Sequence, residues 1–342
     1  MTRTEARLWE KHGSGARCLL CAFFCHLAPG QRGRCGVRVF EDGSVYTLNY
    51  GYTGAMALDP VEKKPFYHFW PGSQTFSVGT PGCNFACLGC QNHSLSQVPE
   101  SWPGVTESPP SPVRKMVEEA VRVGATSLAF TYNEPTVFFE YAQDLAQAGR
   151  EKGLPSLWVT NGFMSKKTIE ALSHVVALNV DLKGFSDSFY HKITGGHLRP
   201  VLESLEIIVT NGIWLEVTTL LIPGENDSEA DLKAMTQWLA DLNPDIPWHI
   251  SRFTPHYRQT HKLPTPISLL EKAREIGREA GLRFIYIGNA QGPGYGDTVC
   301  PNCGEVLIRR SGFWVDDYQL DSGGLCPKCR TEIAGRWRVK EY

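Results

Sequence analysis

The sequence lacks any long hydrophobic stretch. No run of 18 apolar residues occurs in its 342 positions, so we expect no segment that spans a bilayer. The first residues, MTRTEARLWEKHG, contain no apolar core of the kind found in secretory signals. We therefore expect a cytoplasmic protein.

The sequence also lacks a charge excess, internal repeats and low-complexity tracts. A net charge of -2 gives no electrostatic reason to expect a nucleic acid or an anionic membrane as a partner. Hydrophobic and charged contents of 42% and 20% are typical of a globular protein. A chain of 342 residues exceeds the size of most single cores, so we predict two or three domains.

Cysteine, in contrast, is abundant. In a chain without a secretory signal its 11 cysteines should be reduced, which favours metal or cluster ligation over disulfides. The cysteines form two outer groups of four, which can each saturate a tetrahedral ion, and one central group of three, which cannot. The groups are Cys18, Cys21, Cys25 and Cys35; Cys83, Cys87 and Cys90; and Cys300, Cys303, Cys326 and Cys329.

The middle of the chain alternates short apolar runs with longer amphipathic stretches. This alternation predicts parallel βα units, and hence an α/β fold with a full or partial (β/α) barrel; a doubly wound sheet is the alternative. The Pro- and Ser-rich segment 94–112 predicts a surface loop. The expected strands are 74–79, 127–131, 156–160, 178–182, 214–221, 248–253 and 284–287, and the expected helices are 113–123, 137–152, 165–173, 201–210, 229–242 and 268–280.

Polar motifs follow the expected strands at the point where each one ends. In barrels, catalytic groups gather at these strand ends and in the loops after them. The first strand leads into the three-cysteine loop, and later strands end in TYNEP (131–135), TNG (160–162), DLKG (181–184), IPGEND (222–227) and HISRF (249–253).

Three cysteines close together are one ligand short for a cuboidal cluster. A [4Fe–4S] cluster has four irons that cysteine thiolates usually hold, so three thiolates leave one iron open. Catalytic metal sites keep a position open in the same way. The alternative is a zinc site closed by a distant fourth thiolate, which is disfavoured because the outer groups already form complete sets of four.

The spacing Cys83-x3-Cys87-x2-Cys90, after a strand and at the head of a βα repeat, resembles the signature of the radical S-adenosylmethionine (radical SAM) superfamily. The resemblance implies that the open iron chelates the amino and carboxylate groups of S-adenosylmethionine. One electron, supplied by a reductant such as flavodoxin or ferredoxin, then releases a 5′-deoxyadenosyl radical that abstracts hydrogen from a substrate. The protein supplies position and excludes water.

The resemblance also implies roles for other strand ends. TYNEP is similar to the activating-enzyme variant of a Gly-Gly-Glu motif, so Asn133 and Glu134 would hold the methionyl amino group. Asn161 and Lys183 match positions that contact S-adenosylmethionine in pyruvate formate-lyase activating enzyme and its relatives. Lys183 would neutralise the methionyl carboxylate and Asp181 would orient Lys183, although a local ion pair is the alternative.

Two further residues have open roles. His249 and Arg252, three positions apart on one strand, point to opposite faces, and His249 is our candidate for a catalytic role beside Lys183. A buried, hydrogen-bonded core histidine is the alternative. Phe85 in the cysteine loop either shields a cluster or packs in the core.

A narrower resemblance covers nearly the whole chain. The strings CLLCAFFCHLAPGQRGRCGVR, YHFWPGSQTFSVGTPGCNFACLGCQN and CPNCGEVLIRR…CPKCRTEIAGRW together resemble the AmmeMemoRadiSam-type radical enzyme. That family is named for two partner proteins encoded alongside it, so its name implies possible partners or a protein substrate and defines no reaction.

The outer cysteine groups predict metal-binding modules. Cys300-x2-Cys303 and Cys326-x2-Cys329 are typical of a zinc ribbon whose metal stabilises a small core; a rubredoxin-like iron is the alternative. For Cys18, Cys21, Cys25 and Cys35, thiolates alone do not decide between zinc and an auxiliary cluster, and we favour zinc slightly. We predict modules at 1–65, 66–293 and 294–342.

Two functions from different classes fit these features. The first is a radical SAM enzyme, and its likeness to glycyl-radical activating enzymes suggests a protein substrate; segment 91–112 lacks cysteine, which excludes the type with a ferredoxin-like insert. The second is a non-catalytic scaffold whose zinc modules dock a partner or nucleic acid. Its basis is a locally basic tail, partly offset by Asp316, Asp317 and Asp321, that contains Arg309, Arg310, Arg330, Arg336, Arg338 and Lys340.

Overall fold

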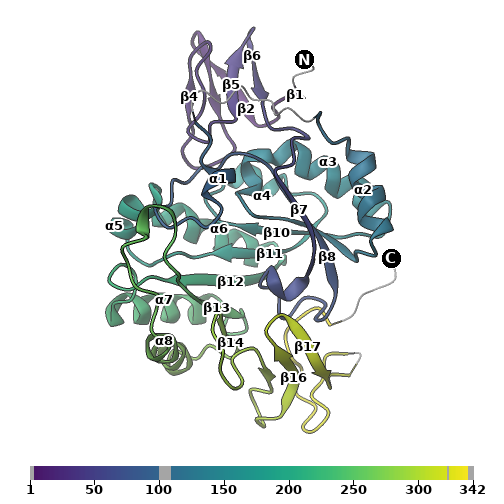
Figure 1. Ribbon diagram of the computed structural model, residues 1–342, viewed down its shortest axis with the longest axis vertical. Coiled ribbons are helices and arrows are strands. Elements are labelled where there is room, and N and C mark those ends of the chain that lie inside the picture. Colours follow the sequence, from purple (N-terminus) through teal and green to yellow (C-terminus); the bar gives the residue numbers. More distant parts are fainter. Residues whose placement is uncertain (1–3, 100–108, 322, 338–342) are drawn as a thin grey trace.

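An eight-stranded sheet forms the centre of the computed structural model, which describes residues 4–99, 109–321 and 323–337 (Figure 1). Strands β8 to β14 run parallel, and β7 pairs antiparallel with β8 at one edge. The strands are β7 (Ala55–Pro60), β8 (Gln74–Gly79), β9 (Ser127–Phe130), β10 (Ser156–Thr160), β11 (Val175–Asp181), β12 (Trp214–Leu221), β13 (Trp248–Arg252) and β14 (Ile285–Gly288).

Helices connect these strands and cover one face of the sheet. Helix α8, for example, buries Leu270, Ala273, Ile276 and Gly277, spaced so that they share one side of the helix. None of the helices in the described part of the chain has the length and apolar character of a membrane span. The helices are α1 (His93–Ser96), α2 (Val113–Arg122), α3 (Phe139–Arg150), α4 (Lys166–Glu170), α5 (Asp187–Phe189), α6 (Leu198–Thr210), α7 (Glu229–Leu242) and α8 (Ile267–Glu279), with single turns η1 (Val61–Lys63), η2 (Pro135–Phe138), η3 (Tyr190–Thr194) and η4 (Tyr257–Gln259).

The strand order identifies a partial barrel. From β8 to β14, each strand pairs with the next one along the chain, so the sheet has no point where the order reverses, as a doubly wound sheet would. Strands β7 and β14 are the two edges, so the sheet is not closed. The predicted α/β class with a partial (β/α) barrel is confirmed.

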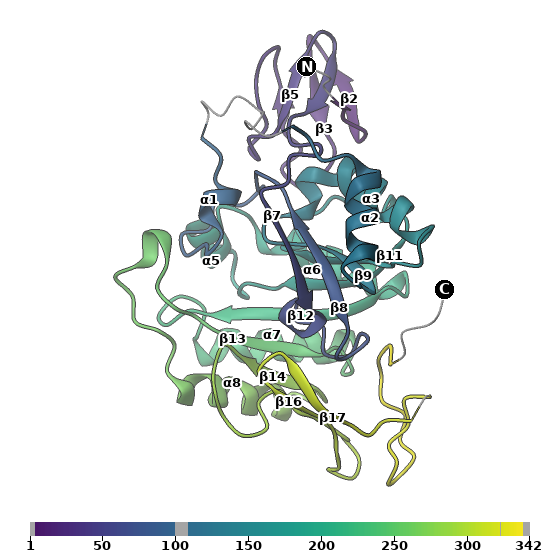
Figure 2. The same ribbon diagram turned by 45° about the vertical axis from the view of Figure 1, so that its right-hand side comes forward.

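Two small β modules flank the central sheet and lie at opposite ends of the molecule (Figures 1 and 2). The N-terminal module has two three-stranded antiparallel sheets, and the C-terminal module has one. Their strands are β1 (Thr4–Glu5), β2 (Trp9–His12), β3 (Gly15–Cys18), β4 (His26–Leu27), β5 (Arg38–Glu41) and β6 (Ser44–Thr47), and then β15 (Thr298–Val299), β16 (Val306–Ser311) and β17 (Trp314–Tyr318).

The predicted boundary after residue 65 separates two strands that pair. Strand β7 pairs with β8 along its whole length, so it belongs to the central sheet. Its outward side chains, such as Met56 and Leu58, are exposed, which left no buried apolar pattern for the sequence to reveal. The domain bounds stay a prediction, but by strand pairing the central unit begins near Ala55.

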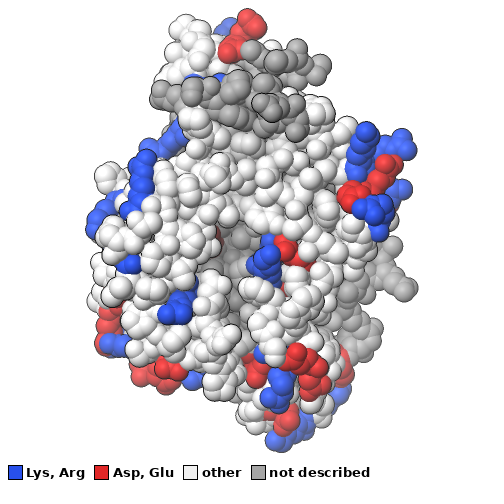
Figure 3. Space-filling model, viewed as in Figure 1, with Lys and Arg blue, Asp and Glu red and all other residues white. Residues whose placement is uncertain are grey.

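Charged side chains on the face seen in Figure 3 lie in small groups, some of mixed sign and some of Lys and Arg alone. One such group is on α2, where Arg122 pairs with Glu119. This face has no broad single-sign patch, in agreement with the net charge of -2.

Candidate active site

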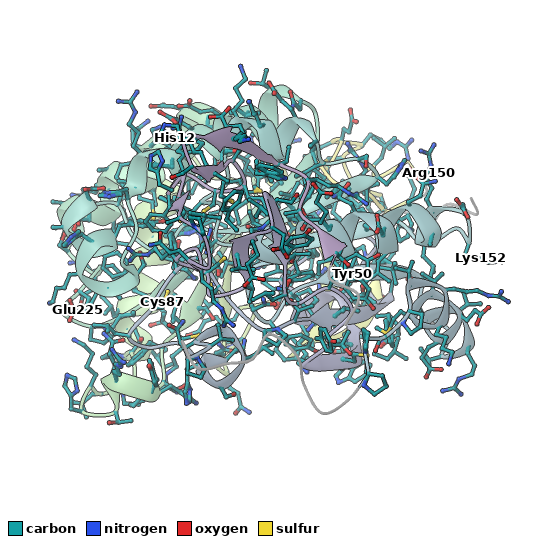
Figure 4. The ribbon with its side chains drawn as sticks, turned by 90° about the horizontal axis from the view of Figure 1, so that it is seen from above. His12, Tyr50, Cys87, Arg150, Lys152 and Glu225 are labelled. Atoms are coloured by element: carbon teal, nitrogen blue, oxygen red, sulfur yellow. The ribbon has the colours of Figure 1, made fainter. Side chains whose placement is uncertain are left out.

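The three-cysteine loop begins where β8 ends. Neighbouring backbone holds it in place: Ala86 N donates to Thr194 O at 2.8 Å and Leu88 N to Ile193 O at 3.0 Å, both in η3. Seen from above, Cys87 lies inside the outline of the molecule, whereas Arg150 and Lys152 lie at its rim (Figure 4). The loop carries three partly exposed thiols, those of Cys83, Cys87 and Cys90.

Phe85 lies beneath this loop and is 1% exposed. Its ring is 5.1 Å from that of Phe163 and 6.2 Å from that of Tyr190. Both neighbours come from segments that follow other strands. Phe85 therefore packs the loop onto the strand ends, which is the core role that we considered.

The TYNEP motif forms a cap at the end of β9. Tyr132 has a φ of 72°, and Glu134 then caps η2, whose first residue is Pro135. Oε1 of Glu134 accepts hydrogen bonds from Thr136 N (3.0 Å), Thr136 Oγ1 (2.6 Å) and Thr160 Oγ1 (2.7 Å), and Oε2 accepts one from Asn161 N (2.7 Å). Glu134 thus joins the ends of β9 and β10.

Glu134 is 1% exposed. Burial raises the pKa of its carboxyl group, and the hydrogen bonds from Thr136 and Asn161 oppose that effect. Oε1 has three donors while Oε2 has one, so within the described residues Oε2 is the oxygen with room for a further donor.

Two asparagines connect these strand ends to the cysteine loop. Nδ2 of Asn133 donates to Gly82 O at 2.6 Å, and its Oδ1 accepts from Thr80 N at 3.2 Å. Nδ2 of Asn161 donates to Oδ1 of Asn84 at 2.7 Å. The structure therefore brings the predicted residues Asn133, Glu134 and Asn161 together around the loop, where Asn133 holds the backbone and Asn161 holds the side chain of Asn84.

Lys183 and Asp181 lie at the end of β11. Lys183 Nζ is 2.8 Å from Asp181 Oδ2, so the local ion pair that we considered is present. Burial disfavours the Lys183 cation, but Asp181 and the Cys87 thiolate outweigh burial and raise the pKa of Lys183. Burial raises the pKa of Cys87 to about 11, and Lys183 opposes this rise. The positive charge of Lys183 therefore acts on one of the three thiols.

The expectation that His249 serves the active site is wrong. Its side chain is 5% exposed, and Nε2 lies 2.7 Å from Oε2 of Glu216, which is fully buried. It occupies the second position of β13, at the opposite end of the strand from Phe253, which reaches the cysteine loop at Gly89. The period-two alternation of a strand predicts which face of the sheet His249 is on, but it does not predict which end of the sheet the side chain is near.

The C-terminal cysteines form a compact group. Cys300 Sγ lies 3.6 Å from Cys329 Sγ and Cys303 Sγ lies 3.7 Å from Cys326 Sγ, and all four sulfurs lie within 4.8 Å of one another. Zn–S bonds of about 2.3 Å in a tetrahedron place thiolates about 3.8 Å apart. This donor set fits a single tetrahedral ion, as predicted.

The eight outer cysteines lie in two groups that are separate from the central loop. The C-terminal four gather around one point, and the N-terminal four line a pocket of their own with Arg38. The central loop therefore offers three thiols. A donor set of three thiolates fits a [4Fe–4S] cluster with one iron open.

Sequence reasoning missed several contributors to the site. The hydroxyls of Thr136 and Thr160 hold Glu134, and Asn84 holds Asn161. Thr160 and Asn84 lie inside the motifs that were singled out, so their position was a usable signal. Glu216, a carboxylate within an apolar strand, was another signal, and it marked the buried network around His249.

Comparison with known proteins agrees with this geometry. A family model described as the radical SAM superfamily matches residues 77–235. An uncharacterized protein of Methanocaldococcus jannaschii is 40% identical over 319 residues, which are 93% of this chain and 94% of that protein. The benzylsuccinate synthase activating enzyme of Thauera aromatica is 28% identical over 135 residues, 36% of this chain and 41% of that enzyme. This chain thus matches less than half of the activating enzyme.

Among solved structures, Streptococcus suis SuiB bound to S-adenosylmethionine superposes with a TM-score of 0.50. The match covers 68% of this chain and 54% of that one at 14% identity. At this identity the likeness shows a shared fold.

Proposed function

Because the chain belongs to the radical SAM superfamily, we propose that Cys83, Cys87 and Cys90 bind a [4Fe–4S] cluster at which S-adenosylmethionine is cleaved reductively. When bound, the cluster and S-adenosylmethionine supply a 5′-deoxyadenosyl radical, which abstracts hydrogen from a substrate. The observation that carries the proposal is the gathering of Glu134, Asn161 and Lys183 around a loop with three thiols.

The residues of the chain have separate tasks in this proposal. Lys183, fixed by Asp181 beside Cys87, provides the positive charge that a carboxylate at the loop would need. Glu134 offers Oε2 to an ammonium group while its other contacts keep it fixed. Asn133 holds the loop backbone at Gly82, and Asn161 joins the end of β10 to the side chain of Asn84 in the loop. Such fixed groups cost little reorganisation when a ligand binds.

Similarity to an activating enzyme supports a partner protein as the substrate. The proposed electron donor is a small reductant of the flavodoxin or ferredoxin class.

The scaffold alternative receives less support from the C-terminal module. Arg310 is buried and lies 3.4 Å from the buried Glu62, and Arg330 pairs with Asp321 at 2.8 Å. Arg338 and Lys340 lie outside the described residues. Arginines that are buried or already paired provide little charge for phosphate contacts.

Anaerobic reconstitution tests the enzyme proposal. The protein, incubated with dithionite and S-adenosylmethionine, should release 5′-deoxyadenosine, and the C83A/C87A/C90A variant should release none. S188A changes an exposed serine within α5 and should behave like the wild type. The proposal fails if the reconstituted wild type binds iron and yields no 5′-deoxyadenosine.

A further inference from the structure

The four N-terminal cysteines line a single pocket. Cys18 ends β3, Cys21 and Cys25 lie in the turn that follows, and Cys35 precedes β5. The pocket also includes the side chain of Arg38. None of these groups belongs to the site described above.

The sulfurs in this pocket are spread differently from those of the C-terminal module. Within the described ranges, sulfurs gather to within 4.8 Å of one another only in the C-terminal group, which has single-ion geometry. No three of the N-terminal thiols lie within 4.8 Å of one another, and the three central thiols do not either. A cuboidal cluster takes one thiolate on each of four irons, so its thiolates stand farther apart than those around a single ion.

Arg38 supplies an independent observation. Its side chain is 2% exposed, and Nη2 donates to both oxygens of Glu140 at 2.5 and 2.6 Å. Its Nε and Nη1 are also buried, and neither has a hydrogen-bond partner among the residues that the structure describes. Buried guanidinium donors require acceptors. Arg38 therefore presents unused donors and a positive charge at a pocket lined by thiols.

We infer that this pocket binds a second [4Fe–4S] cluster, with Cys18, Cys21, Cys25 and Cys35 each holding one iron. Arg38 then donates hydrogen bonds to the sulfurs of the cluster and offsets their negative charge. Because all four irons have a thiolate from the chain, none is open to S-adenosylmethionine. The inference replaces the slight preference for zinc at this group and does not depend on the proposed function.

The pocket lies directly against the candidate active site. Thr136, which donates two hydrogen bonds to Glu134, also lines the pocket. A Cβ atom on Gly82, next to Cys83, would lie 2.9 Å from the carbonyl oxygen of Cys35. The second cluster is therefore a close neighbour of the three-cysteine loop.

Metal analysis of the C83A/C87A/C90A variant tests this inference. Its remaining cysteines are the two outer groups, so after anaerobic reconstitution with ferrous iron and sulfide it should hold about four irons, about four sulfides and about one zinc. The dithionite-reduced variant should show a four-iron EPR signal that S-adenosylmethionine leaves unchanged. The wild type should hold about eight irons and about one zinc.

Wild-type protein with about four irons and about two zincs would overturn the inference, and so would a folded triple variant with zinc but no iron. The matched variant, C18A/C21A/C25A/C35A, should keep about four irons whose EPR signal responds to S-adenosylmethionine. If either variant fails to fold, the wild-type metal count decides the question. Loss of 5′-deoxyadenosine formation in the triple variant does not bear on it, because the readout is the metal content.

Discussion

At the scale of single residues, Glu134 is held by donors from the segments that follow β9 and β10. It takes four hydrogen bonds from two neighbouring segments while 1% exposed. A residue that only awaited a ligand would not require so many internal donors. Glu134 therefore shapes the strand ends as well as serving the proposed function.

We predict that E134Q lowers both stability and activity. A glutamine places an amide NH2 against donors that now meet a carboxylate oxygen, so at least one buried donor loses its acceptor. The free energy of unfolding should fall by about 2–4 kcal/mol, and 5′-deoxyadenosine formation should fall at least about tenfold. Denaturant unfolding and single-turnover assays measure the two effects.

E119Q is the matched control, because the half-exposed Glu119 of α2 forms its ion pair in the described part of the chain with Arg122. Its free energy of unfolding should stay at the wild-type value, because exposed ion pairs contribute little. Equal stability of the two variants would show that the contacts of Glu134 contribute little.

At the scale of elements, the cysteine loop depends on its packing against the N-terminal module. Gly82 has a φ of 101°, and a Cβ atom there would lie 2.6 Å from Val37 Cγ1 and 2.9 Å from Cys35 O. Only glycine combines this backbone conformation with so close an approach. The close packing of the cysteine loop against the N-terminal module therefore requires glycine at position 82.

G82A should displace the loop and reduce cluster binding. We expect the iron bound at the central cysteines to fall by more than half and the free energy of unfolding to fall by about 2–4 kcal/mol, because the clash involves backbone. G124A provides the comparison: Gly124 has a φ of 77° but open space around its Cβ position. It should cost about 1 kcal/mol and leave iron binding unchanged. Equal iron contents in the two variants would contradict the packing argument.

At the scale of the whole molecule, the segment between β7 and β8 joins the sheet to the C-terminal module. Glu216 in β12 accepts hydrogen bonds from Tyr67 N and His68 N, both at 2.9 Å. His68 Nδ1 donates to Ala334 O at 2.7 Å, and Nε2 accepts from the Tyr286 hydroxyl at 2.5 Å. These hydrogen bonds therefore attach the C-terminal module to the strand ends that lie opposite the candidate active site.

This junction predicts a dependence of stability on acid pH. Burial lowers the pKa of His68 to about 4, although Glu216 opposes the shift. Between the unfolded pKa of about 6.5 and the folded value, the unfolded chain binds the extra proton, so stability falls as pH falls. The loss is about 1.4 kcal/mol per pH unit, or about 3 kcal/mol in full.

Denaturant unfolding at pH 6.5 and 5.0 measures this effect. H68Q removes the titrating ring, so its stability should fall by about 2 kcal/mol less over this interval than that of the wild type. H12Q changes an exposed histidine of β2 and should keep the wild-type dependence. An H68Q protein with the full wild-type slope would show that other groups carry the pH dependence.

Much of the fold could be predicted because it depends on local patterns. The strands 74–79, 156–160 and 214–221 and the helix 229–242 coincide with β8, β10, β12 and α7. Alternating apolar positions and helix-start residues specify such elements within a few residues, as with Ser228, which caps α7. Strand β7 was missed because its exposed Met56 and Leu58 hide that pattern.

The sequence by itself determined which residues carry the chemistry, since cysteine spacing and strand-end motifs are written in the order of the chain. Only the tertiary structure decided how deeply each of these side chains is buried and which residues surround it. It placed His249 in a buried network, buried Arg310 against Glu62, and set Arg38 among four spread thiols. Such burial arises from contacts between residues that are distant in the sequence, as with Arg38 and Glu140 or Arg310 and Glu62, and no local pattern encodes these contacts.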